Sequence, residues 1–409
     1  MSDIETSEQH FDYDVAIVGA GPVGLALAGW LARRNATSRL SIALIDARTP
    51  ESAAGDPRAL ALSHGSRVML QELGFPADST PIRRIHVSQR GHFGRTLIEH
   101  DEHELPELGY VVRYGSLVGA LANAVRAMPV HWLTNTSALT PLQDRDGVTL
   151  PLRTTGQTTG QAAKSERSIR VKVLVNAEGG LYQQKEPKDE PAPGQRRSRD
   201  YGQTAIVGTV SVSSPHPNVA WERFTPEGPI ALLPCGGPRH ADYSLVWCAS
   251  PEEAARRMEL SDDALLAELG HAFGTRMGQF TRMTGRAAFP LGLTALHTLI
   301  DRRTVAIGNA AQTLHPVAGQ GLNLGLRDAR ALTDALSVDG PRPLALAHFA
   351  QRRALDRHLT IGATDTLARI FTVDFPPLAA MRGLALTALE FLPPVKTALA
   401  RQMMFGQRR

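Results

Sequence analysis

The segment Asp12-Tyr-Asp-Val-Ala-Ile-Val-Gly19 leads directly into Gly19-Ala-Gly-Pro-Val-Gly24 near the start of the chain. Its continuous apolar run is typical of a buried parallel strand that ends in a glycine turn. A helix is expected over Pro22 to Arg34, followed by a second strand over Ser41-Ile-Ala-Leu-Ile-Asp46. Strand, helix and strand in this order form a right-handed βαβ unit. The stretch therefore predicts an α/β fold with a Rossmann-like domain.

The three glycines of this turn have the spacing of a dinucleotide fingerprint. Gly19 permits the tight turn, Gly21 lets the backbone approach a pyrophosphate, and Gly24 lets the helix pack closely on the strand. The helix N-terminus supplies unpaired N–H groups and partial positive charge for phosphate. Asp46 follows Gly24 by 22 residues, where a carboxylate can accept from ribose hydroxyls. The pattern predicts an adenine dinucleotide and does not distinguish FAD from NAD.

A second glycine-rich stretch lies late in the chain and reads Ile307-Gly-Asn-Ala-Ala-Gln-Thr-Leu-His-Pro-Val-Ala-Gly-Gln-Gly-Leu-Asn-Leu-Gly-Leu-Arg-Asp328. A short strand over 303–307 ends at Gly308, and a helix is expected to begin within the glycine-rich part. Its N-terminus offers backbone donors for the far end of a flavin, with Asn309 as the candidate ribitol contact. Together the two motifs predict one flavin held at both ends.

His315 and Pro316 are the candidate catalytic residues, through the environment that they give the flavin. His315 has two interpretations. It can act as a general base, since its ordinary pKa lies near neutrality. A histidine before proline at a loop corner is more often a packed, hydrogen-bonded residue that orients the loop.

The rest of the chain indicates a second, β-rich lobe. Helices are expected over 57–73, 115–128 and 251–273, a pair of strands over 82–99, and a β-meander over 137–177. The charged, proline-containing segment 185–200 is expected to be an exposed or disordered loop. Alternating apolar runs predict an antiparallel sheet, and they are Thr204–Val212, Val219–Phe224, Ile230–Leu233 and Tyr243–Cys248.

Composition narrows the class of protein. The chain has 409 residues and a net charge of +4, with two cysteines, Cys235 and Cys248, that form neither a CxxC nor a metal-ligand pattern. A reducing cytoplasm and no bound metal are expected. No apolar run of about 18 residues and no signal-peptide pattern is present. A disulfide reductase does not fit without a redox CxxC, and a simple NAD dehydrogenase leaves 308–328 unexplained.

The C-terminal segment from Pro376 carries five basic residues against Glu390, which equals the whole charge excess. Interleaved leucines are compatible with an amphipathic end that meets an anionic membrane surface or a partner. A solvated helix that packs on the body is the other interpretation, and it is the favoured one. Nothing in the charge pattern indicates a nucleic-acid partner.

These motifs resemble the ubiquinone-biosynthesis branch of the single-component, FAD-dependent aromatic hydroxylases. In that branch the late motif reads close to GNAAQTLHPxAGQGxNLGxRD, which residues 308–328 match almost throughout. The similarity extends over nearly the whole chain. Further matching stretches are Arg58-Ala-Leu-Ala-Leu-Ser63, Leu73-Gly74, Asp200-Tyr-Gly-Gln203, Ala231-Leu-Leu-Pro234, Trp247 and the region from Arg382 to Gly406.

The resemblance implies a domain layout and further site residues. It implies an FAD-binding domain over 1–75, 100–180 and 285–370, a substrate-binding β-sheet domain over 76–99 and 181–284, and a helical C-terminal segment over 371–409. Arg58 and Arg113 would contact the FAD, and the sheet of 201–248 would form the roof of the substrate pocket. The residues implied to line the flavin ring are Pro316, Gly319, Gly321, Leu322 and Asn323.

One segment departs from the wider family, whose members carry an Asp-Gly pair followed by serine and arginine. Here the sequence is Asn176-Ala-Glu178-Gly179-Gly180-Leu-Tyr. Glu178 keeps the negative charge on a longer side chain and is the candidate cofactor contact at this place. Because the Asp-Gly motif is associated with both FAD and NAD(P)H contacts, this departure bears on how nicotinamide reduces the flavin.

The activity that the resemblance implies is a monooxygenase reaction. NAD(P)H reduces FAD, O2 forms a C4a-hydroperoxyflavin, and an aromatic ring of a polyprenyl-phenol intermediate of ubiquinone biosynthesis is hydroxylated. A non-catalytic flavin-binding subunit of a ubiquinone-biosynthesis complex is the alternative. Other proteins of that pathway and peripheral contact with the inner membrane are the implied partners. The ring position, the choice of NADH or NADPH, and the oligomeric state do not follow from the sequence.

Overall fold

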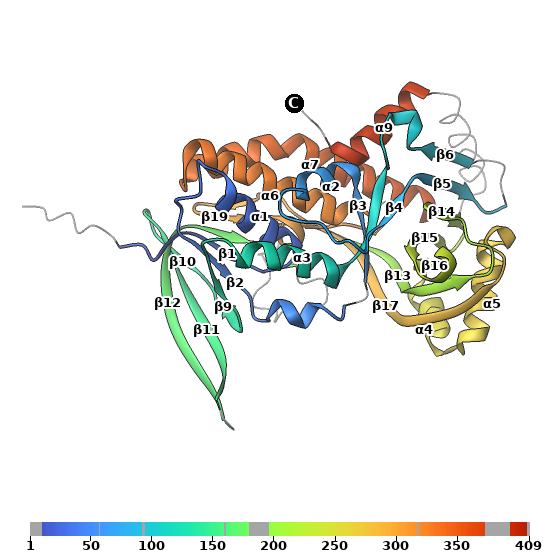
Figure 1. The fold of residues 1–409 in the computed structure, drawn as a ribbon, viewed down its shortest axis with the longest axis horizontal. Helices are drawn as coiled ribbons and strands as arrows, with labels where there is room; N and C mark the ends of the chain where they lie inside the picture. The colour runs from blue at the N-terminus through green and yellow to red at the C-terminus, as the bar shows by residue number, and fades with distance from the viewer. Residues whose placement is uncertain are drawn as a thin grey trace, which may run out of the picture.

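The computed structural model describes residues 10–56, 58–91, 95–158, 161–179, 196–316, 319–372 and 393–406 (Figure 1). Its first sheet contains a parallel core in the order β19-β12-β1-β2-β8, in which helix α1 (Pro22–Arg33) connects β1 to β2. This arrangement confirms the expected βαβ unit. The core strands are β1 (Tyr13–Val18), β2 (Ile42–Ile45), β8 (Val130–Leu133), β12 (Gln161–Asn176) and β19 (Thr304–Ala306).

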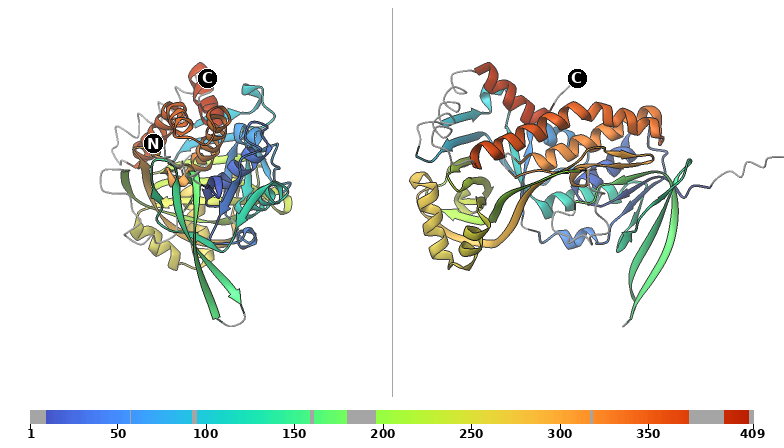
Figure 2. Two further views of the ribbon diagram at one scale, coloured as in Figure 1. Left: turned by 90° about the vertical axis from the view of Figure 1, so that its left-hand side faces the viewer. Right: turned by 180° about the vertical axis from the view of Figure 1, so that it is seen from behind.

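Each face of the first sheet is covered. Val15 and Ile17 of β1 point to the face that packs on α1, α3 (Tyr114–Arg126), α6 (Gln320–Asp339) and α7 (Pro343–Thr372). The intervening Ala16 and Val18 point to the other face, which packs on the meander. This alternation is the two-residue period of a strand buried on both sides. The meander strands are β9 (Thr136–Ala138), β10 (Leu142–Gln143) and β11 (Val148–Thr158), and the β11–β12 hairpin projects from the body in Figure 2.

The second sheet has eight strands in the order β20-β17-β13-β16-β15-β14-β5-β6. Helices α4 (Pro251–Glu259) and α5 (Asp262–Phe273) cover one of its faces, where Trp221, Trp247 and Phe273 are buried. Its strands are β5 (Arg84–Gln89), β6 (Arg95–Glu99), β13 (Arg196–Val212), β14 (Val219–Thr225), β15 (Gly228–Gly236), β16 (Asp242–Ala249), β17 (Phe280–Leu296) and β20 (Gln312–Thr313).

A small third sheet lies between the two lobes. It joins β3 (Ala59–Ser63), β7 (Gly109–Arg113) and β4 (Thr80–Ile82), and its Ile82 and Val111 pack against Ala220 and Leu233 of the second sheet. Helices α2 (His64–Leu70) and α9 (Pro393–Phe405) pack beside it. The expected domain limits stay a prediction. Two strands do not follow them, because β4 joins this middle sheet and all of β17 joins the second sheet. Among the helices of the described residues, none is long and apolar enough to cross a membrane.

Three local expectations need correction. The helix expected over 57–73 is wrong in its first half, because residues 59–63 form β3 and pair with β7. The alanines and leucines there favour a helix, but the tertiary pairing overrides this weak preference. The loop expected over 185–200 is wrong from Arg196 onward, because β13 begins there and its Arg197 and Arg199 form ion pairs with Asp365. Residues 180–195 lie outside the described part. The helix expected over 251–273 is two helices, the second capped by Ser261.

A buried charge cluster fixes α6 and α7 to the late glycine motif. The Asp328 carboxylate is fully buried and accepts from the Gly308 backbone N–H at 3.3 Å and from Gln312 Nε2 at 2.8 Å. Arg353 of α7 donates to it at 2.7 Å and also pairs with Asp356. Because every charge in this cluster has an opposite partner, the ions tolerate burial.

We predict that Asp328→Ala strongly destabilises the protein, because Arg353 would keep a buried charge with one partner removed. Breaking such a pair costs about 3–5 kcal/mol of unfolding free energy. Asp334→Ala on the same helix is the matched control, because its pair with Arg34 is about one-third exposed and such pairs contribute about 1 kcal/mol or less. Urea unfolding measures both values, and equal losses for the two variants would contradict this account.

Candidate flavin and substrate site

The N-terminus of α1 is built so that only glycine fits. Gly19 has a φ of +104°, and a β-carbon on it would lie 2.7 Å from the Ala177 carbonyl oxygen. A β-carbon on Gly24 would lie 1.9 Å from the Gly19 carbonyl oxygen. Gly21 is the N-cap, and Pro22 occupies the first helical turn without a side-chain cap on the exposed N–H groups. The backbone conformation that a phosphate-binding helix N-terminus needs is therefore present, and phosphate binding by this turn stays a prediction.

Asp46 stands at the end of β2, as predicted, and it also shapes the glycine turn. Its Oδ2 accepts from the Ala20 N–H at 2.7 Å, and its Oδ1 accepts from the Arg48 N–H at 2.8 Å. Each carboxylate oxygen has a second lone pair for another donor. Contact with a ribose hydroxyl stays a prediction, and the carboxylate orientation that it needs is already fixed.

Arg58 and Tyr114 lie beside the fingerprint. Arg58 pairs with Asp56 at 2.6 Å, and its guanidinium carbon lies 4.6 Å from the centre of the Tyr114 ring. The Tyr114 hydroxyl would lie 3.5 Å from a β-carbon on Gly21. Burial raises the pKa of Tyr114, so its hydroxyl keeps a proton to donate. The sequence analysis did not identify Tyr114; the signal was its place directly after the predicted contact Arg113, whose own side chain is exposed.

The two glycine motifs contact each other through Val23 of α1. Gly308 has a φ of +60°, and a β-carbon on it would lie 3.3 Å from the Val23 methyl groups. On Gly325 of α6, a β-carbon would lie 2.8 Å from Val23 and 3.0 Å from the Gly308 α-carbon. The structure thus brings the early and late motifs, 285 residues apart in the chain, into one site.

Asn309 and Glu178 lie at the carboxyl ends of neighbouring strands. A β-carbon on Gly179 would lie 3.6 Å from the Asn309 side chain. Glu178 has an exposed side chain, and its backbone N–H donates to the Asn176 carboxamide oxygen at 3.0 Å. The β12 end is therefore part of the same region. Cofactor contacts by Asn309 and Glu178 stay predictions, and residues 180–182 of the unusual segment lie outside the described part.

Two glycines at the N-terminus of α6 differ in the space around them. Gly319 is tightly packed, whereas Gly321 has space beside its α-carbon among the described residues. Gly319 has a φ of +59°, and a β-carbon on it would lie 3.0 Å from the Ala61 β-carbon. A β-carbon on Gly321 would meet none of the described atoms within 4 Å. Leu322 is partly buried against the main core. The helix start therefore has room beside Gly321, as a ring packed on the backbone requires.

The Asn323 side chain connects the N-terminus of α6 to β3 and α2 by hydrogen bonds. Its Nδ2 donates to the carbonyl oxygens of Ala61 at 3.1 Å and Gly319 at 2.9 Å. Its Oδ1 accepts from the Ser63 N–H at 2.9 Å and the Ser66 hydroxyl at 2.7 Å. All four hydrogen-bonding positions of the carboxamide are used. Contact between Asn323 and a flavin, which stays a prediction, would have to use its backbone.

His315 is almost completely buried where the late motif meets the second sheet. Its Nε2 lies 3.3 Å from Gln203 Oε1, and the Tyr201 ring approaches edge-on with centroids 5.1 Å apart. Burial lowers the pKa of His315 to about 4, which makes the ring neutral at physiological pH. Pro316 is exposed and its carbonyl accepts from the Gly319 N–H at 3.0 Å. These contacts favour the orienting interpretation, and a catalytic role for either residue stays a prediction.

The face of the second sheet opposite α4 and α5 is apolar. Ala205, Cys248 and Leu291 are buried on it together with Val207 and Val246. Gln203 lies on the same face, because it precedes Ala205 by two residues on β13. Burial raises the pKa of both Cys235, to about 11, and Cys248, so the two thiols are packing residues rather than nucleophiles.

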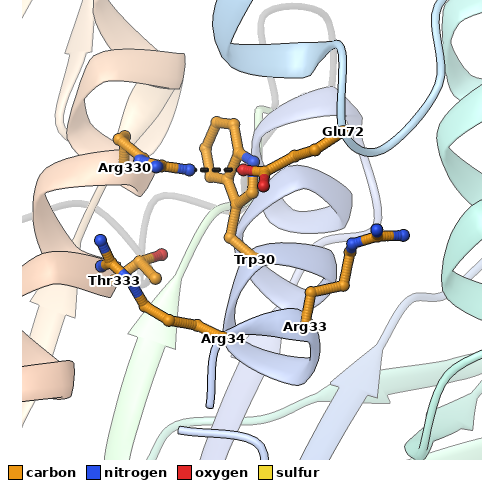
Figure 3. A pocket seen from close by; sticks show the side chains of 6 residues that line it. All are labelled: Trp30, Arg33, Arg34, Glu72, Arg330 and Thr333. Carbon is orange, nitrogen blue, oxygen red and sulfur yellow. Dashed lines mark hydrogen bonds and ion pairs between the residues drawn. The ribbon is translucent and has the colours of Figure 1, made fainter. Parts of the chain in front are cut away.

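A separate cavity of about 210 Å³ lies away from this region (Figure 3). Trp30, Arg33 and Arg34 from the C-terminal half of α1 line it, whereas the glycine turn precedes the N-terminus of the same helix. Arg330 and Glu72 pair across it at 2.6 Å. This cavity is therefore distinct from the flavin region.

The described residues fit a bound FAD on grounds of donor chemistry and space. The α1 N-terminus offers N–H groups for the phosphates, Tyr114 offers a hydroxyl next to them, and the open side of Gly321 leaves room for a ring. The α6 N-terminus adds partial positive charge, which stabilises electron density that develops on a reduced ring.

Comparisons with known proteins agree with this geometry. The family model described as an FAD-binding domain matches residues 12–339. The ubiquinone hydroxylase UbiL of Rhodospirillum rubrum is 33% identical, covering 96% of this chain and 89% of that protein. The 3-demethoxyubiquinol 3-hydroxylase of Escherichia coli is 30% identical, covering 92% of this chain and 94% of that protein.

Solved structures show the same fold at low identity. The p-nitrophenol 4-monooxygenase PnpA of Pseudomonas putida superposes with a TM-score of 0.74 at 15% identity, covering 97% of this chain and 99% of that one. The mixed α/β aromatic-hydroxylase fold expected from the sequence is confirmed. With the two glycine motifs joined at Val23 and relatives that match over almost their full length, the chain belongs to the FAD-binding domain family, in its branch of ubiquinone-biosynthesis hydroxylases, and is an FAD-dependent monooxygenase.

Proposed function

We propose that this protein hydroxylates an aromatic ring of a polyprenyl-phenol intermediate in ubiquinone biosynthesis, with FAD, NAD(P)H and O2. The observation that carries the proposal is the contact of the early and late glycine motifs around Val23, next to an apolar sheet face. Relatives named as ubiquinone hydroxylases and as a 3-demethoxyubiquinol 3-hydroxylase support the substrate class. A non-catalytic flavin-binding subunit is not favoured, since these relatives are hydroxylases.

The residues that would hold FAD have distinct tasks in this proposal. The α1 N-terminus and Tyr114 bind the phosphates, Asp46 binds the ribose, and Asn309 binds the ribitol. FAD supplies the redox chemistry that takes reducing equivalents from NAD(P)H and delivers one oxygen atom of O2 to the ring. The second sheet presents an apolar face that includes Ala205 and Leu291. Through this face the chain orients the substrate and excludes water.

In the same proposal His315 is a positioning residue. A neutral, buried imidazole that contacts Gln203 and Tyr201 joins the late motif to the second sheet. The strand β20 reinforces this junction, because Thr313 pairs with Thr294 of β17 just before His315. The loop that carries Pro316 and Gly319 therefore has a fixed start.

The proposal extends to peripheral contact with the inner membrane and with other ubiquinone-biosynthesis proteins. A polyprenyl substrate partitions into lipid, so an enzyme that uses it benefits from membrane contact. In α9, Arg401 is exposed, whereas Lys396 is buried against Glu102 at 3.0 Å and does not contribute a surface charge. The apolar residues expected to accompany the charge, Leu384 to Leu392, lie outside the described part. Co-sedimentation with anionic vesicles tests this extension, and no sedimentation would reject it.

We predict that Gly321→Ala weakens FAD binding at least tenfold without reducing stability. The protein leaves room for the new methyl group, so only a ring packed on this backbone would clash with it. Gly119→Ala on α3 is the matched control, because it also has no neighbour within 4 Å and removes a helical glycine at a gain of up to about 1 kcal/mol. Flavin fluorescence titration measures affinity. Unchanged FAD affinity in Gly321→Ala would remove this residue from the flavin site.

We predict that the FAD-loaded protein adds 16 mass units to a prenylated phenol in the presence of NAD(P)H and O2, with label from ¹⁸O2 in the product. Mass spectrometry measures the product, and absorbance measures flavin reduction. Flavin that NADH and NADPH both leave oxidised would support the non-catalytic subunit instead. Reduced flavin with peroxide as the only product for all ubiquinone precursors would reject the hydroxylase proposal.

We predict that His315→Asn reduces the acid sensitivity of the fold. The pKa of His315 is lowered to about 4, below the value near 6.5 in unfolded chains. Its contribution to stability is therefore complete above pH 6.5 and is lost as the pH falls towards 4, at up to about 1.4 kcal/mol per pH unit. Urea unfolding at pH 7 and pH 5 measures the difference. The same loss in the variant as in the wild type would contradict the buried neutral ring.

A further inference from the structure

Glu222 occupies an unexpected place in the second sheet. Its neighbours on β14, Trp221 and Arg223, point to the side of α5. The Trp221 ring contacts the Phe273 ring edge-on, and Arg223 lies close to Gly274. Because successive strand residues alternate, Ala220 and Glu222 point to the opposite side. Ala220 packs there against the middle sheet, which lies between the two lobes. Glu222 therefore faces the interior between the two lobes.

The surroundings of Glu222 are mostly apolar, with Gln89 of β5 as a buried polar neighbour on the same face. Its cross-strand partners are Val87 on β5 and Ala231 on β15. Along its own strand, the residues on the same face are Ala220 and Phe224, both buried. The Oε1 atom is shielded from solvent and has no hydrogen-bond partner among the described residues. Glu222 as a whole is half-buried, so it is this shielded oxygen that lacks the partner that buried polar groups normally have.

This face borders the candidate flavin site on two sides. On one side, Ala220 and Leu233 pack against Ile82 and Val111. On the other side, Gln203 contacts His315 of the late motif. Glu222 lies between these two contacts on the same sheet face, so a ring bound under this face would be within the region that Glu222 borders.

The protonation state defines what Glu222 can bind. Burial alone raises the pKa of Glu222 to about 8, and burial and the charge of Glu222 raise the pKa of the Cys248 thiol. At pH 7 the side chain is a neutral carboxylic acid, with one O–H donor and one carbonyl acceptor. A phenol hydroxyl offers the matching acceptor and donor on one oxygen atom.

We propose that Glu222 is a substrate-positioning residue that forms hydrogen bonds with the ring hydroxyl of the phenolic substrate beneath the second sheet. The proposal rests on the proposed hydroxylase function and assigns the group that orients the ring at that site. The shielded Oε1 has no partner among the described residues, so a ligand that supplies one recovers the free energy lost by an unmade hydrogen bond. The apolar neighbours Val87 and Ala231 would contact the ring.

The test compares 2-geranylphenol with its methyl ether, which keeps the shape and loses the hydroxyl donor. Binding to the FAD-loaded protein is measured by quenching of flavin fluorescence. We expect the wild type to prefer the phenol about tenfold, the value of one net hydrogen bond. Glu222→Met should lose this preference, and Glu222→Gln, which keeps a donor and an acceptor, should retain it. Glu166→Gln, an exposed residue of the β11–β12 hairpin, is the control and should behave as wild type.

The outcomes separate this inference from the function on which it rests. If wild type hydroxylates 2-geranylphenol and Glu222→Met keeps the phenol preference, the role of Glu222 is rejected and the hydroxylase function stands. If wild type binds neither compound and hydroxylates no prenylphenol, both are rejected. A misfolded variant is recognised by its melting temperature. We expect Glu222→Met to melt at or above the wild-type temperature, because it replaces an unpaired buried polar group by an apolar one.

Discussion

The hydrogen bonds that Asp328 accepts hold the site together. One buried carboxylate reaches the backbone of Gly308, the side chain of Gln312 and the guanidinium of Arg353. Gly308 is the point where the late motif touches α1, and Arg353 anchors α7 over α6. Without this carboxylate, Gly308 would lose the hydrogen bond that fixes its position relative to α6 and to Val23.

Backbone geometry, more than side-chain chemistry, defines the flavin region. Gly24 and Gly325 are positions where a methyl group would overlap neighbouring atoms, so their glycines serve close packing. Gly321 is the opposite case, because none of the described atoms would lie within 4 Å of a β-carbon on it. Asn323 uses all of its hydrogen bonds to hold the start of α6. The protein therefore provides a rigid frame of N–H groups and leaves the reaction to the cofactor and the apolar face opposite.

The sequence predicts the parts of this site whose function depends on a glycine pattern. Gly19, Gly21 and Gly24 follow from spacing alone, and the family resemblance adds the late motif. Tyr114 and Glu222 are different, because their importance comes from what lies across from them in space. The sequence pattern Ala-Trp-Glu-Arg-Phe predicts that its glutamate is a solvent-facing residue of a strand. Only the packing of the middle sheet makes that face an interior. The helix expected over 57–73 was wrong in its first half for the same reason, because the pairing of β3 with β7 decides the conformation of that segment.

The ladder between β17 and β20 also limits how the two lobes move. A strand of the second sheet is hydrogen-bonded at Ala295 to Gln312, whose side chain donates to Asp328. Opening the lobes as rigid bodies about a hinge would break these hydrogen bonds and expose a buried charge, so such a motion is energetically unfavourable. Substrate entry and product exit that leave this ladder intact therefore require local rearrangement of loops around a fixed frame.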